Sequence, residues 1–291
     1  MKKNSISMHS TVAGSGNLAS MVEAARLAGF DAVEPVYSAL YDYLDAGYSV
    51  SDLRRLLDGL ELPGVGWIDD IERQGEPFEA YLDKCERLFS LCGQVGVKGV
   101  QMLTGPLDYR AVEAYRAGKP FDGYMGLQDK TPEEQVKLTA KNCARLADAA
   151  APYGLTLYME PLCWTPLGNL QYGCRIIEQT GRDNLKLCMD FWHFFVAGDT
   201  PDDVAALPKE YIYGVHICDS LKPDGGVPNE SILRAVPLGE GVIPVREWVD
   251  AVKSTGFDGW WGCESFDHRQ NQMSLNASAV KNYKELSAFV R

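Results

Sequence analysis

The feature of this sequence that most constrains its fold is a unit that recurs along the whole chain, in which a short apolar run is followed by a polar loop and an amphipathic segment. Several of the apolar runs contain almost no polar residue, which is typical of strands that are covered on both faces. Alternation of such runs with helical segments predicts parallel strands joined by helical crossovers. The eight predicted strands are 5–9, 32–36, 64–68, 99–103, 156–159, 185–189, 212–216 and 259–263.

The segments between the predicted strands carry apolar residues at helical spacing. In 18–28 the apolar positions form one stripe, and 78–95 and 133–153 are longer versions of the same pattern. The last of these has clear start signals, because Thr131 can cap the helix and Pro132 suits its first position. These segments are therefore predicted to be helices that cover the strands.

Eight strand–helix units in 291 residues predict a closed (β/α)8 TIM barrel, which belongs to the α/β class. The alternative is an open, doubly wound sheet, which fits the strand count and the chain length less well. No low-complexity tract or Pro/Ser-rich linker divides the sequence, so we expect one domain over residues 1–291. Two unusually long connections, 104–130 and 220–241, follow strands and are expected to border the mouth of the barrel.

The charge balance restricts the partners of the chain. With 28 basic and 40 acidic side chains the net charge is −12, and such a field repels the phosphates of nucleic acids. No apolar stretch reaches the length of a membrane span, and no apolar region of signal-peptide length follows Lys2 and Lys3. We therefore expect a cytoplasmic protein with no nucleic-acid or membrane partner. Its eight cysteines are expected to be reduced and mostly buried.

Four successive predicted strands end in a side chain that can bind a metal ion. These side chains are Glu160, Asp190, His216 and Glu264. Because the ends of consecutive strands surround one mouth of a barrel, we expect the four side chains to converge. Three clustered carboxylates would repel one another unless a cation lay among them. The sequence therefore predicts a divalent-metal site.

The donor set also indicates which ion is preferred. Oxygen-rich sets with one imidazole suit Mn²⁺, Mg²⁺ or Co²⁺, whereas thiolates favour Zn²⁺. Mn²⁺ is our first choice, with Mg²⁺, Co²⁺ and Zn²⁺ as alternatives. Strand alternation places Cys188 on the same side as Asp190, one layer below it, and turns Cys263 away from Glu264. Both cysteines, and Cys218, are predicted to be core residues rather than ligands.

Four motifs resemble those of a known family. They are Met159-Glu160-Pro161, Met189-Asp190-Phe191-Trp192-His193, Val215-His216-Ile217-Cys218-Asp219 and Val236-Pro237-Leu238-Gly239-Glu240-Gly241. In this order they are similar to motifs of the xylose-isomerase-like barrels, the superfamily of sugar phosphate isomerases and epimerases, ketose 3-epimerases, inosose dehydratases and endonuclease-IV-type enzymes. The resemblance covers most of the chain and is strongest from about residue 154 to residue 264.

The resemblance implies a role for each motif residue. The metal ligands that it implies are Glu160, Asp190, His216 and Glu264. It implies that His193 contacts the substrate and, as in the epimerase branch, that the two glutamates act as acid and base on opposite faces of the substrate. In that branch an arginine commonly lies six residues after the histidine of the seventh strand. This chain has Lys222 there and its nearest arginine is Arg234, which is a departure from the ketose 3-epimerases.

Other polar residues near predicted strand ends are candidates for substrate contacts. His9 ends the first strand and Glu34 lies in the second, so both can line the mouth. Lys222 and Arg234 lie in the connection after the seventh strand, where barrels often bind phosphate. We expect these four residues, together with His193, to contact the substrate. Asp219 is a further candidate to orient or join the metal site.

The predicted site suits chemistry next to a carbonyl group. A metal chelated by two neighbouring sugar oxygens lowers the pKa of the adjacent C–H group, and a carboxylate then removes the proton to give an enediolate. Return of the proton gives an epimer or an isomer, whereas loss of a β-hydroxyl gives an elimination product. The first hypothesis is a metal-dependent sugar or sugar phosphate isomerase or epimerase of carbohydrate metabolism. The alternative is a lyase that acts on an inosose or a 3-keto sugar.

Two further hypotheses come from other classes of protein. A DNA-repair endonuclease of the endonuclease-IV type needs a histidine-rich multi-zinc site and a basic surface, but this chain has four histidines and a net charge of −12. A non-catalytic sugar-binding barrel would not need four intact ligands. The expected partner is therefore a small sugar or polyol ketone, and barrels of this kind are often homo-oligomers.

Overall fold

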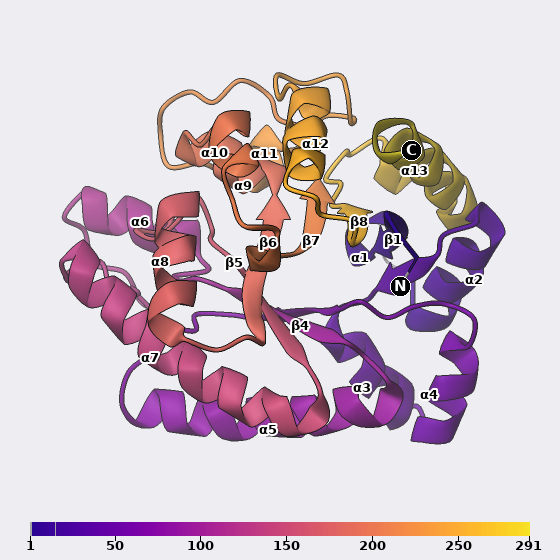
Figure 1. The fold of residues 1–291 in the computed structure, drawn as a ribbon, viewed down its shortest axis with the longest axis horizontal. Helices are drawn as coiled ribbons and strands as arrows, with labels where there is room; N and C mark the ends of the chain where they lie inside the picture. Colours follow the sequence, from indigo (N-terminus) through magenta and orange to yellow (C-terminus); the bar gives the residue numbers. More distant parts are fainter. Residues whose placement is uncertain (1, 15) are drawn as a thin grey trace.

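The computed structural model describes residues 2–14 and 16–291 and shows eight parallel strands in a nearly closed ring with helices outside it. The chain is a single-domain (β/α)8 TIM barrel, as predicted (Figure 1). The predicted strands agree with the observed ones to within two residues at each end. The strands are β1 Ser5–His9, β2 Ala32–Glu34, β3 Val65–Ile68, β4 Gly99–Leu103, β5 Thr156–Glu160, β6 Leu185–Asp190, β7 Ile212–Ile217 and β8 Trp260–Cys263.

The order of the strands excludes the open, doubly wound alternative. It runs β2-β1-β8-β7-β6-β5-β4-β3, so strands that follow one another in the chain are neighbours in the wall. The ends of this order, β2 and β3, are joined by two isolated bridges, Ala32 to Glu61 and Val36 to Gly66. We call this join the seam. It closes the ring with fewer backbone hydrogen bonds than a continuous ladder would provide.

The helices form the outer layer. Their bounds are α1 Ser10–Ala13, α2 Leu18–Ala28, α3 Tyr37–Asp45, α4 Val50–Leu57, α5 Glu76–Val95, α6 Tyr109–Arg116, α7 Pro132–Ala150, α8 Leu170–Thr180, α9 Phe191–Ala197, α10 Pro201–Ala205, α11 Glu230–Leu233, α12 Val245–Ser254 and α13 Leu275–Val290. Short 3-10 turns cover Ala151–Tyr153, Lys209–Tyr211 and Gln270–Gln272. The predicted start of α7 is confirmed, because the Thr131 hydroxyl accepts the Glu134 N–H and the Glu134 carboxylate accepts the Thr131 N–H.

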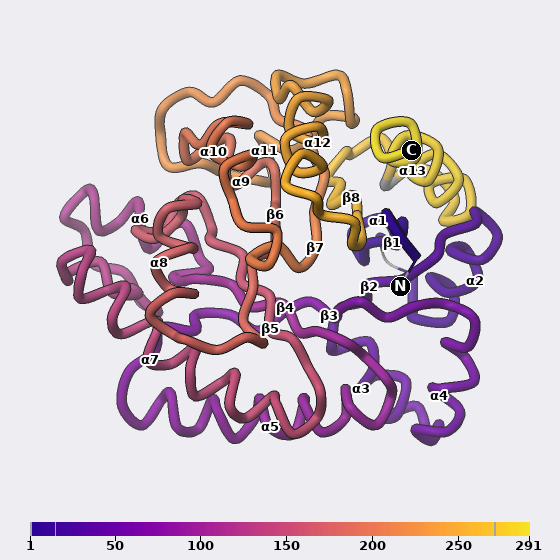
Figure 2. Tube along the Cα trace, in the orientation of Figure 1, coloured from indigo at the N-terminus to yellow at the C-terminus, as the bar shows by residue number. Residues whose placement is uncertain are grey.

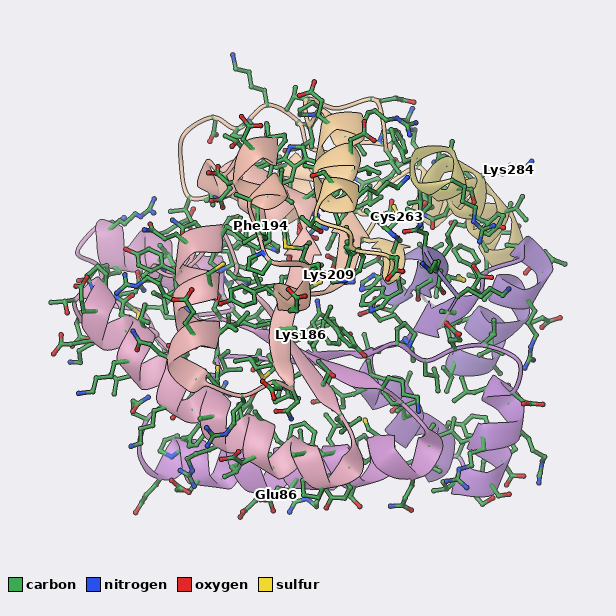
Figure 3. The ribbon with its side chains drawn as sticks, viewed as in Figure 1. Glu86, Lys186, Phe194, Lys209, Cys263 and Lys284 are labelled. Atoms are coloured by element: carbon green, nitrogen blue, oxygen red, sulfur yellow. The ribbon has the colours of Figure 1, made fainter. Side chains whose placement is uncertain are left out.

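The first and last residues of the described chain meet at one carboxylate. Asp31 pairs with Lys2 at 2.8 Å and with Arg291 at 2.7 Å, and both tube and ribbon show α13 beside β1 and α2 (Figures 1 and 2). Charged side chains such as Glu86 and Lys284 lie on the outside of the helical layer (Figure 3). Among the helices that the structure describes, none combines the length and the apolar character that crossing a bilayer requires.

Two glycines in and next to β3 make room for polar side chains inside the barrel. A Cβ atom at Gly64 would overlap the hydroxyl group of Tyr158, which points in from β5. A Cβ atom at Gly66 would lie 2.9 Å from the side-chain oxygen of Gln101, which comes from β4. Tyr158 and Gln101 are almost completely buried, so the interior of the barrel below the mouth contains polar groups.

The connection after β3 holds the start of the long connection 104–130 through two buried acids. Glu72, 3% exposed, accepts the Gly105 N–H at 2.9 Å, and Asp70 accepts the Leu107 N–H at 2.7 Å. Burial raises the pKa of Glu72 to about 7, because the ionised carboxylate loses its water and has Asp70 nearby. Glu72 therefore loses its proton near neutral pH and is mostly protonated in mildly acidic solution.

We expect Glu72→Gln to remove part of the pH dependence of folding stability. The folded chain binds the Glu72 proton more tightly than the unfolded chain, whose pKa is near 4.5. The stabilisation is therefore complete below about pH 4.5 and is lost as the pH rises through about 7, a change of about 3 kcal/mol. Urea unfolding near pH 5 and near pH 8 measures the change. Glu76→Gln, which alters an exposed acid of α5, should unfold like the unmodified chain, and an unchanged pH dependence in Glu72→Gln would contradict the expectation.

Candidate metal centre

The four side chains predicted to converge do meet at the mouth of the barrel. Glu160 and Asp190 end β5 and β6, His216 lies in β7, and Glu264 follows β8. The strand register brings them level, since Asp190 is paired with His216 and His216 with Gly262. One ligand atom from each side chain lies within 4.8 Å of the others, and only Glu264 is partly exposed. We call these four residues the ligand cluster, and metal binding by them remains a prediction.

A basic residue of the chain reaches into the ligand cluster. Arg234 follows α11 in the long connection after β7, and its Nη2 atom lies 3.0 Å from Asp190 Oδ2 and 2.9 Å from Glu264 Oε2. The guanidinium is 2% exposed and packs between the rings of Trp192 and Phe266. The ligand cluster offers three carboxylates and one imidazole, and Arg234 offsets only part of their negative charge. This oxygen-rich donor set therefore fits a divalent ion.

The acids of the ligand cluster respond differently to burial. Burial alone would raise the pKa of Glu264, but the Arg234 guanidinium outweighs it and lowers that pKa to about 2. For Asp190 the burial effect is larger than the attraction of Arg234, so its pKa is raised. Glu264 is therefore held as the carboxylate, the form needed either for binding a cation or for accepting a proton.

Glu160 is held by three neighbours. Its Oε1 atom lies 3.1 Å from His193 Nε2, and its Oε2 atom accepts a hydrogen bond from the Gln101 amide at 2.7 Å and lies 3.3 Å from His216 Nδ1. Burial would raise the pKa of Glu160, but the neighbouring imidazoles of His193 and His216 keep it well below its ordinary value. Since His193 Nδ1 accepts the Cys163 N–H, His193 donates through Nε2. This geometry favours a positioning role for His193, and its substrate contact stays a prediction.

Glu34 is not placed to contact substrate, and our expectation for it was wrong. The side chain is fully buried below the ligand cluster. Its Oε2 atom lies 2.9 Å from His216 Nε2, and its Oε1 atom accepts a hydrogen bond from the Tyr158 hydroxyl. Burial would raise the pKa of Glu34, but His216 outweighs it and lowers that pKa. Both oxygens are engaged within the protein, because β2 turns this side chain into the barrel interior.

His9 lies beside the ligand cluster, as its position at the end of β1 predicted. Its ring centre is 4.8 Å from that of His216. Its Nδ1 atom accepts the Thr11 N–H at 3.2 Å, so the ring proton is on Nε2. Burial lowers the pKa of His9 and so favours the neutral ring. His9 can therefore offer one N–H donor at the mouth.

Two residues of the connection after β7 do not join the ligand cluster. Lys222 is exposed and has no hydrogen bond or ion pair with the ligand cluster in the part of the chain that the structure describes, and its substrate contact stays a prediction. Asp219 accepts backbone N–H groups instead. Their donors are Ser220, Gly239, Gly241 and Ile243, at 2.8–3.1 Å. Asp219 therefore fixes the loop around Glu240, and the expectation that it joins the metal site was wrong.

The same connection crosses above the mouth. The Asn229 side-chain amide donates to the Tyr109 hydroxyl oxygen of α6 at 2.8 Å, 120 residues earlier in the chain.

Cys188 and Cys218 are buried, as predicted. The Cys188 Sγ atom lies 3.5 Å from His216 Nδ1, and the Cys218 Sγ atom lies 3.5 Å from Asp190 Oδ1. The ligand cluster is thus enclosed from above by the connection and from below by polar and thiol groups.

Sequence reasoning missed Gln101 and Tyr158. Gln101 orients Glu160 and Tyr158 orients Glu34. Both lie in the middle of strands whose other residues are mostly apolar, and this break in the apolar pattern was the available signal.

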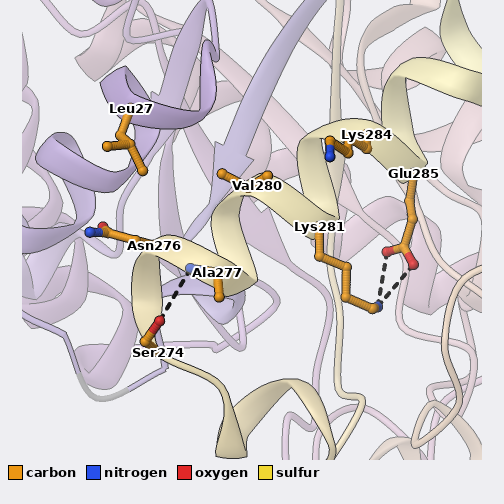
Figure 4. Close-up of a pocket in the computed structure, with 8 residues that line it drawn as sticks. All are labelled: Leu27, Ser274, Asn276, Ala277, Val280, Lys281, Lys284 and Glu285. Carbon is orange, nitrogen blue, oxygen red and sulfur yellow. Dashed lines mark hydrogen bonds and ion pairs between the residues drawn. The ribbon is translucent and has the colours of Figure 1, made fainter.

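A hollow of about 740 Å³ lies on the outer surface between α2 and α13 (Figure 4). No residue of the ligand cluster lines it.

The family can now be assigned from the comparison with known families. The family model described as xylose isomerase-like TIM barrel matches residues 22–291. This chain belongs to the xylose isomerase-like TIM barrel family. The expected resemblance is thereby confirmed. The curated relatives of this barrel include inosose isomerases and a 3-dehydroshikimate dehydratase, so membership supports an enzyme.

Among solved structures, the barrel is similar to that of the IolI protein with a bound zinc atom, with a TM-score of 0.83 and 18% identity over 98% of this chain and 99% of the other. It is also similar to D-allulose 3-epimerase from Methylomonas sp., with a TM-score of 0.70 and 17% identity over 99% and 98% of the two chains. At these identities the likeness concerns the fold.

Among curated proteins, this barrel is 27% identical over 281 residues to 3-dehydroshikimate dehydratase of Pseudomonas aeruginosa, covering 95% of this chain and 40% of that protein. It is also 27% identical over 169 residues to inosose isomerase of Halalkalibacterium halodurans, covering 56% of this chain and 58% of that protein. The matches thus span less than two thirds of either relative. Isomerisation and dehydration both occur among the relatives.

Proposed function

We propose that this protein is a divalent-metal-dependent enzyme that isomerises or epimerises a small sugar or polyol ketone. The observation that carries the proposal is the placement of two glutamates from different strands, Glu160 and Glu264, around His216. The pKa of each glutamate is lowered, so both side chains are carboxylates near neutral pH. Proton removal and proton return require two such groups beside the reacting carbon.

The ligand cluster would hold the metal ion. Mn²⁺ remains our first choice, because carboxylate oxygens dominate the donor set. A divalent ion bound there would polarise a carbonyl group and acidify the neighbouring C–H group. The IolI protein, a barrel of the same fold, has a bound zinc atom, so a metal ion can be held by a barrel of this kind.

The remaining side chains suit the charge that develops during proton transfer. Glu160 and Glu264 act as base and acid on the carbon next to the carbonyl. Arg234 Nη1 lies 3.6 Å from Glu230 Oε2, but Nε has no hydrogen-bond partner among the described residues, so the Nε–H group can donate to an anionic oxygen. The Nε2–H of His9 provides a neutral donor on the β1 side. Arg234 thereby takes the place that the family pattern gives to the residue at Lys222.

Elimination of water is the second candidate. The observation that favours it is the length of the match to the 3-dehydroshikimate dehydratase, which covers 95% of this chain against 56% for the inosose isomerase. The first step is the same, since the carbanion that can be reprotonated can also expel a β-hydroxyl group. The acid that protonates the leaving hydroxyl would then be one of the same two glutamates.

Deuterium incorporation distinguishes the two candidates. We expect the chain, supplied with Mn²⁺ in D₂O, to place deuterium next to the carbonyl of a ketose or an inosose without loss of water, as followed by NMR. Formation of an unsaturated product from an inosose or from 3-dehydroshikimate would favour the dehydratase. If neither exchange nor elimination occurred with any member of such a panel, both candidates would be wrong.

A further inference from the structure

A buried hydrogen-bonded pair lies behind His216, on the side away from the other ligands. Glu34 and Tyr158 are fully buried, and both Glu34 oxygens and the Tyr158 hydroxyl are engaged with protein groups below the ligand cluster, so neither residue is placed to contact a substrate. The Tyr158 hydroxyl donates to Glu34 Oε1, and Glu34 Oε2 lies 2.9 Å from His216 Nε2. The three side chains come from β2, β5 and β7. They form a chain of hydrogen bonds that ends at the ring of one ligand.

The two nitrogens of His216 face different groups. Nδ1 lies 3.3 Å from Glu160 Oε2 and 3.8 Å from Glu264 Oε2, which places it in the ligand cluster. Nε2 faces Glu34. A ligand imidazole offers a lone pair on one nitrogen and carries its proton on the other. Binding of a metal ion through Nδ1 therefore requires the ring proton on Nε2, and this N–H group donates a hydrogen bond to the Glu34 carboxylate.

Tyr158 fixes the orientation of Glu34. By engaging Oε1 it leaves Oε2 directed at His216. The Tyr158 ring stacks on Tyr213 at 5.1 Å and meets the edge of Trp260 at 5.8 Å, so its own position is set by packing. Its hydroxyl group occupies space that a side chain at residue 64 would fill, and this position is a glycine.

We propose that Glu34 and Tyr158 are positioning residues that set the metal affinity of the site by holding His216 with its proton on Nε2. Neither residue is a ligand, and neither touches substrate. Outer carboxylates of this kind commonly change metal affinity by about 10- to 100-fold when they are removed. The inference rests on the metal centre of the proposed function.

The chain offers a matched control for the test. Tyr213 stacks on Tyr158, but its hydroxyl group donates to the Pro63 carbonyl at 2.6 Å and takes no part in the hydrogen bonds behind His216. Tyr158→Phe and Tyr213→Phe thus each remove one hydroxyl group from the same stacked pair. Only Tyr158→Phe is expected to change metal binding by the ligand cluster. Glu34→Gln removes the charge of the acceptor while keeping its shape.

The test is a titration of the metal-free full chain and its variants with Zn²⁺, by calorimetry against a competing chelator. We expect Glu34→Gln to weaken Zn²⁺ binding about 10- to 100-fold and Tyr158→Phe about fivefold, with Tyr213→Phe unchanged. Urea unfolding of the metal-free proteins is measured in parallel. A purely structural role would lower the unfolding midpoints of Tyr158→Phe and Tyr213→Phe alike and leave both affinities equal, which would overturn the inference.

A second readout reports the ring proton itself. The chain has four histidines, so the ring nitrogens can be resolved by NMR of the ¹⁵N-histidine-labelled, Zn²⁺-loaded protein. We expect a protonated Nε2 and an unprotonated Nδ1 at His216. A proton on Nδ1, or normal affinity in both Glu34→Gln and Tyr158→Phe, would overturn the inference alone. Failure of the unmodified chain to bind Zn²⁺ or Mn²⁺ would overturn the metal centre of the proposed function and this inference together.

Discussion

Glu264→Gln is expected to lower the rate of deuterium exchange into a substrate ketone by about 10²- to 10⁴-fold, the usual contribution of a positioned acid–base group. Glutamine keeps the shape of the side chain and can still face Arg234, but it cannot accept a proton. Arg234 lowers the pKa of Glu264 to about 2, so the side chain is a carboxylate over the whole working pH range. NMR of the exchange under single-substrate conditions in D₂O measures the effect.

Glu240→Gln provides the control for Glu264→Gln. Glu240 is exposed near the same mouth and pairs with Arg269 at 3.1 Å, so its replacement removes one carboxylate without touching the ligand cluster. We expect a change of no more than about twofold, as for ordinary surface substitutions. Metal affinity of both variants is measured as well, so that loss of a ligand can be separated from loss of proton transfer. Unchanged exchange in Glu264→Gln with metal bound would exclude Glu264 as an acid or base.

Arg234→Met is expected to destabilise the metal-free protein by about 3–5 kcal/mol, because it leaves two buried carboxylates without their cation. Arg234 is 2% exposed and bridges Asp190 and Glu264. Methionine fills similar space between Trp192 and Phe266, so the loss of charge dominates the effect. Urea unfolding of the chelator-treated protein measures the difference.

Arg269→Met is the matched control for Arg234→Met, since Arg269 forms an exposed ion pair with Glu240. Its loss should change the unfolding free energy by less than about 1 kcal/mol. Addition of Mn²⁺ should stabilise both proteins, because the ion binds the folded chain, and it should recover part of the deficit of Arg234→Met. Equal stability of metal-free Arg234→Met and the unmodified chain would show that the acids are not held by Arg234.

The ligand cluster could be predicted from the sequence because its position depends only on the order of the strands. Glu160, Asp190, His216 and Glu264 each end an apolar run, and neighbouring parallel strands in a barrel deliver their ends to one place. No knowledge of the loops is needed for this step. Arg234 was recognised as a candidate from its place in the connection after β7, but its direct contact with two ligands depends on how that connection folds over the mouth.

The wrong expectations for Glu34 and Asp219 have a common physical cause. Position near a strand end does not say whether a polar side chain points into the barrel, toward loop amides or into solvent. Glu34 points inward to His216, Asp219 is taken by the backbone N–H groups of the Gly239–Gly241 turn, and Lys222 stays in solvent. Such choices are made by partners far away in sequence, such as Tyr158 at a separation of 124 residues from Glu34.

The seam between β2 and β3 gives the barrel wall two unequal halves. Strands β5 to β7 and the residue after β8 provide every member of the ligand cluster, and β5 to β8 are joined by ladders of three or more residue pairs each. In contrast, β2 meets the β3 side through single backbone bonds such as Val33 N–H to Glu61 and Gly66 N–H to Pro35, each 3.0 Å. Glu34 lies on the weaker half, between those two bonds. The half of the wall that contributes no member of the ligand cluster thus carries the carboxylate behind His216, and we expect a sequence change in the seam to alter the predicted metal site without changing any of its four side chains.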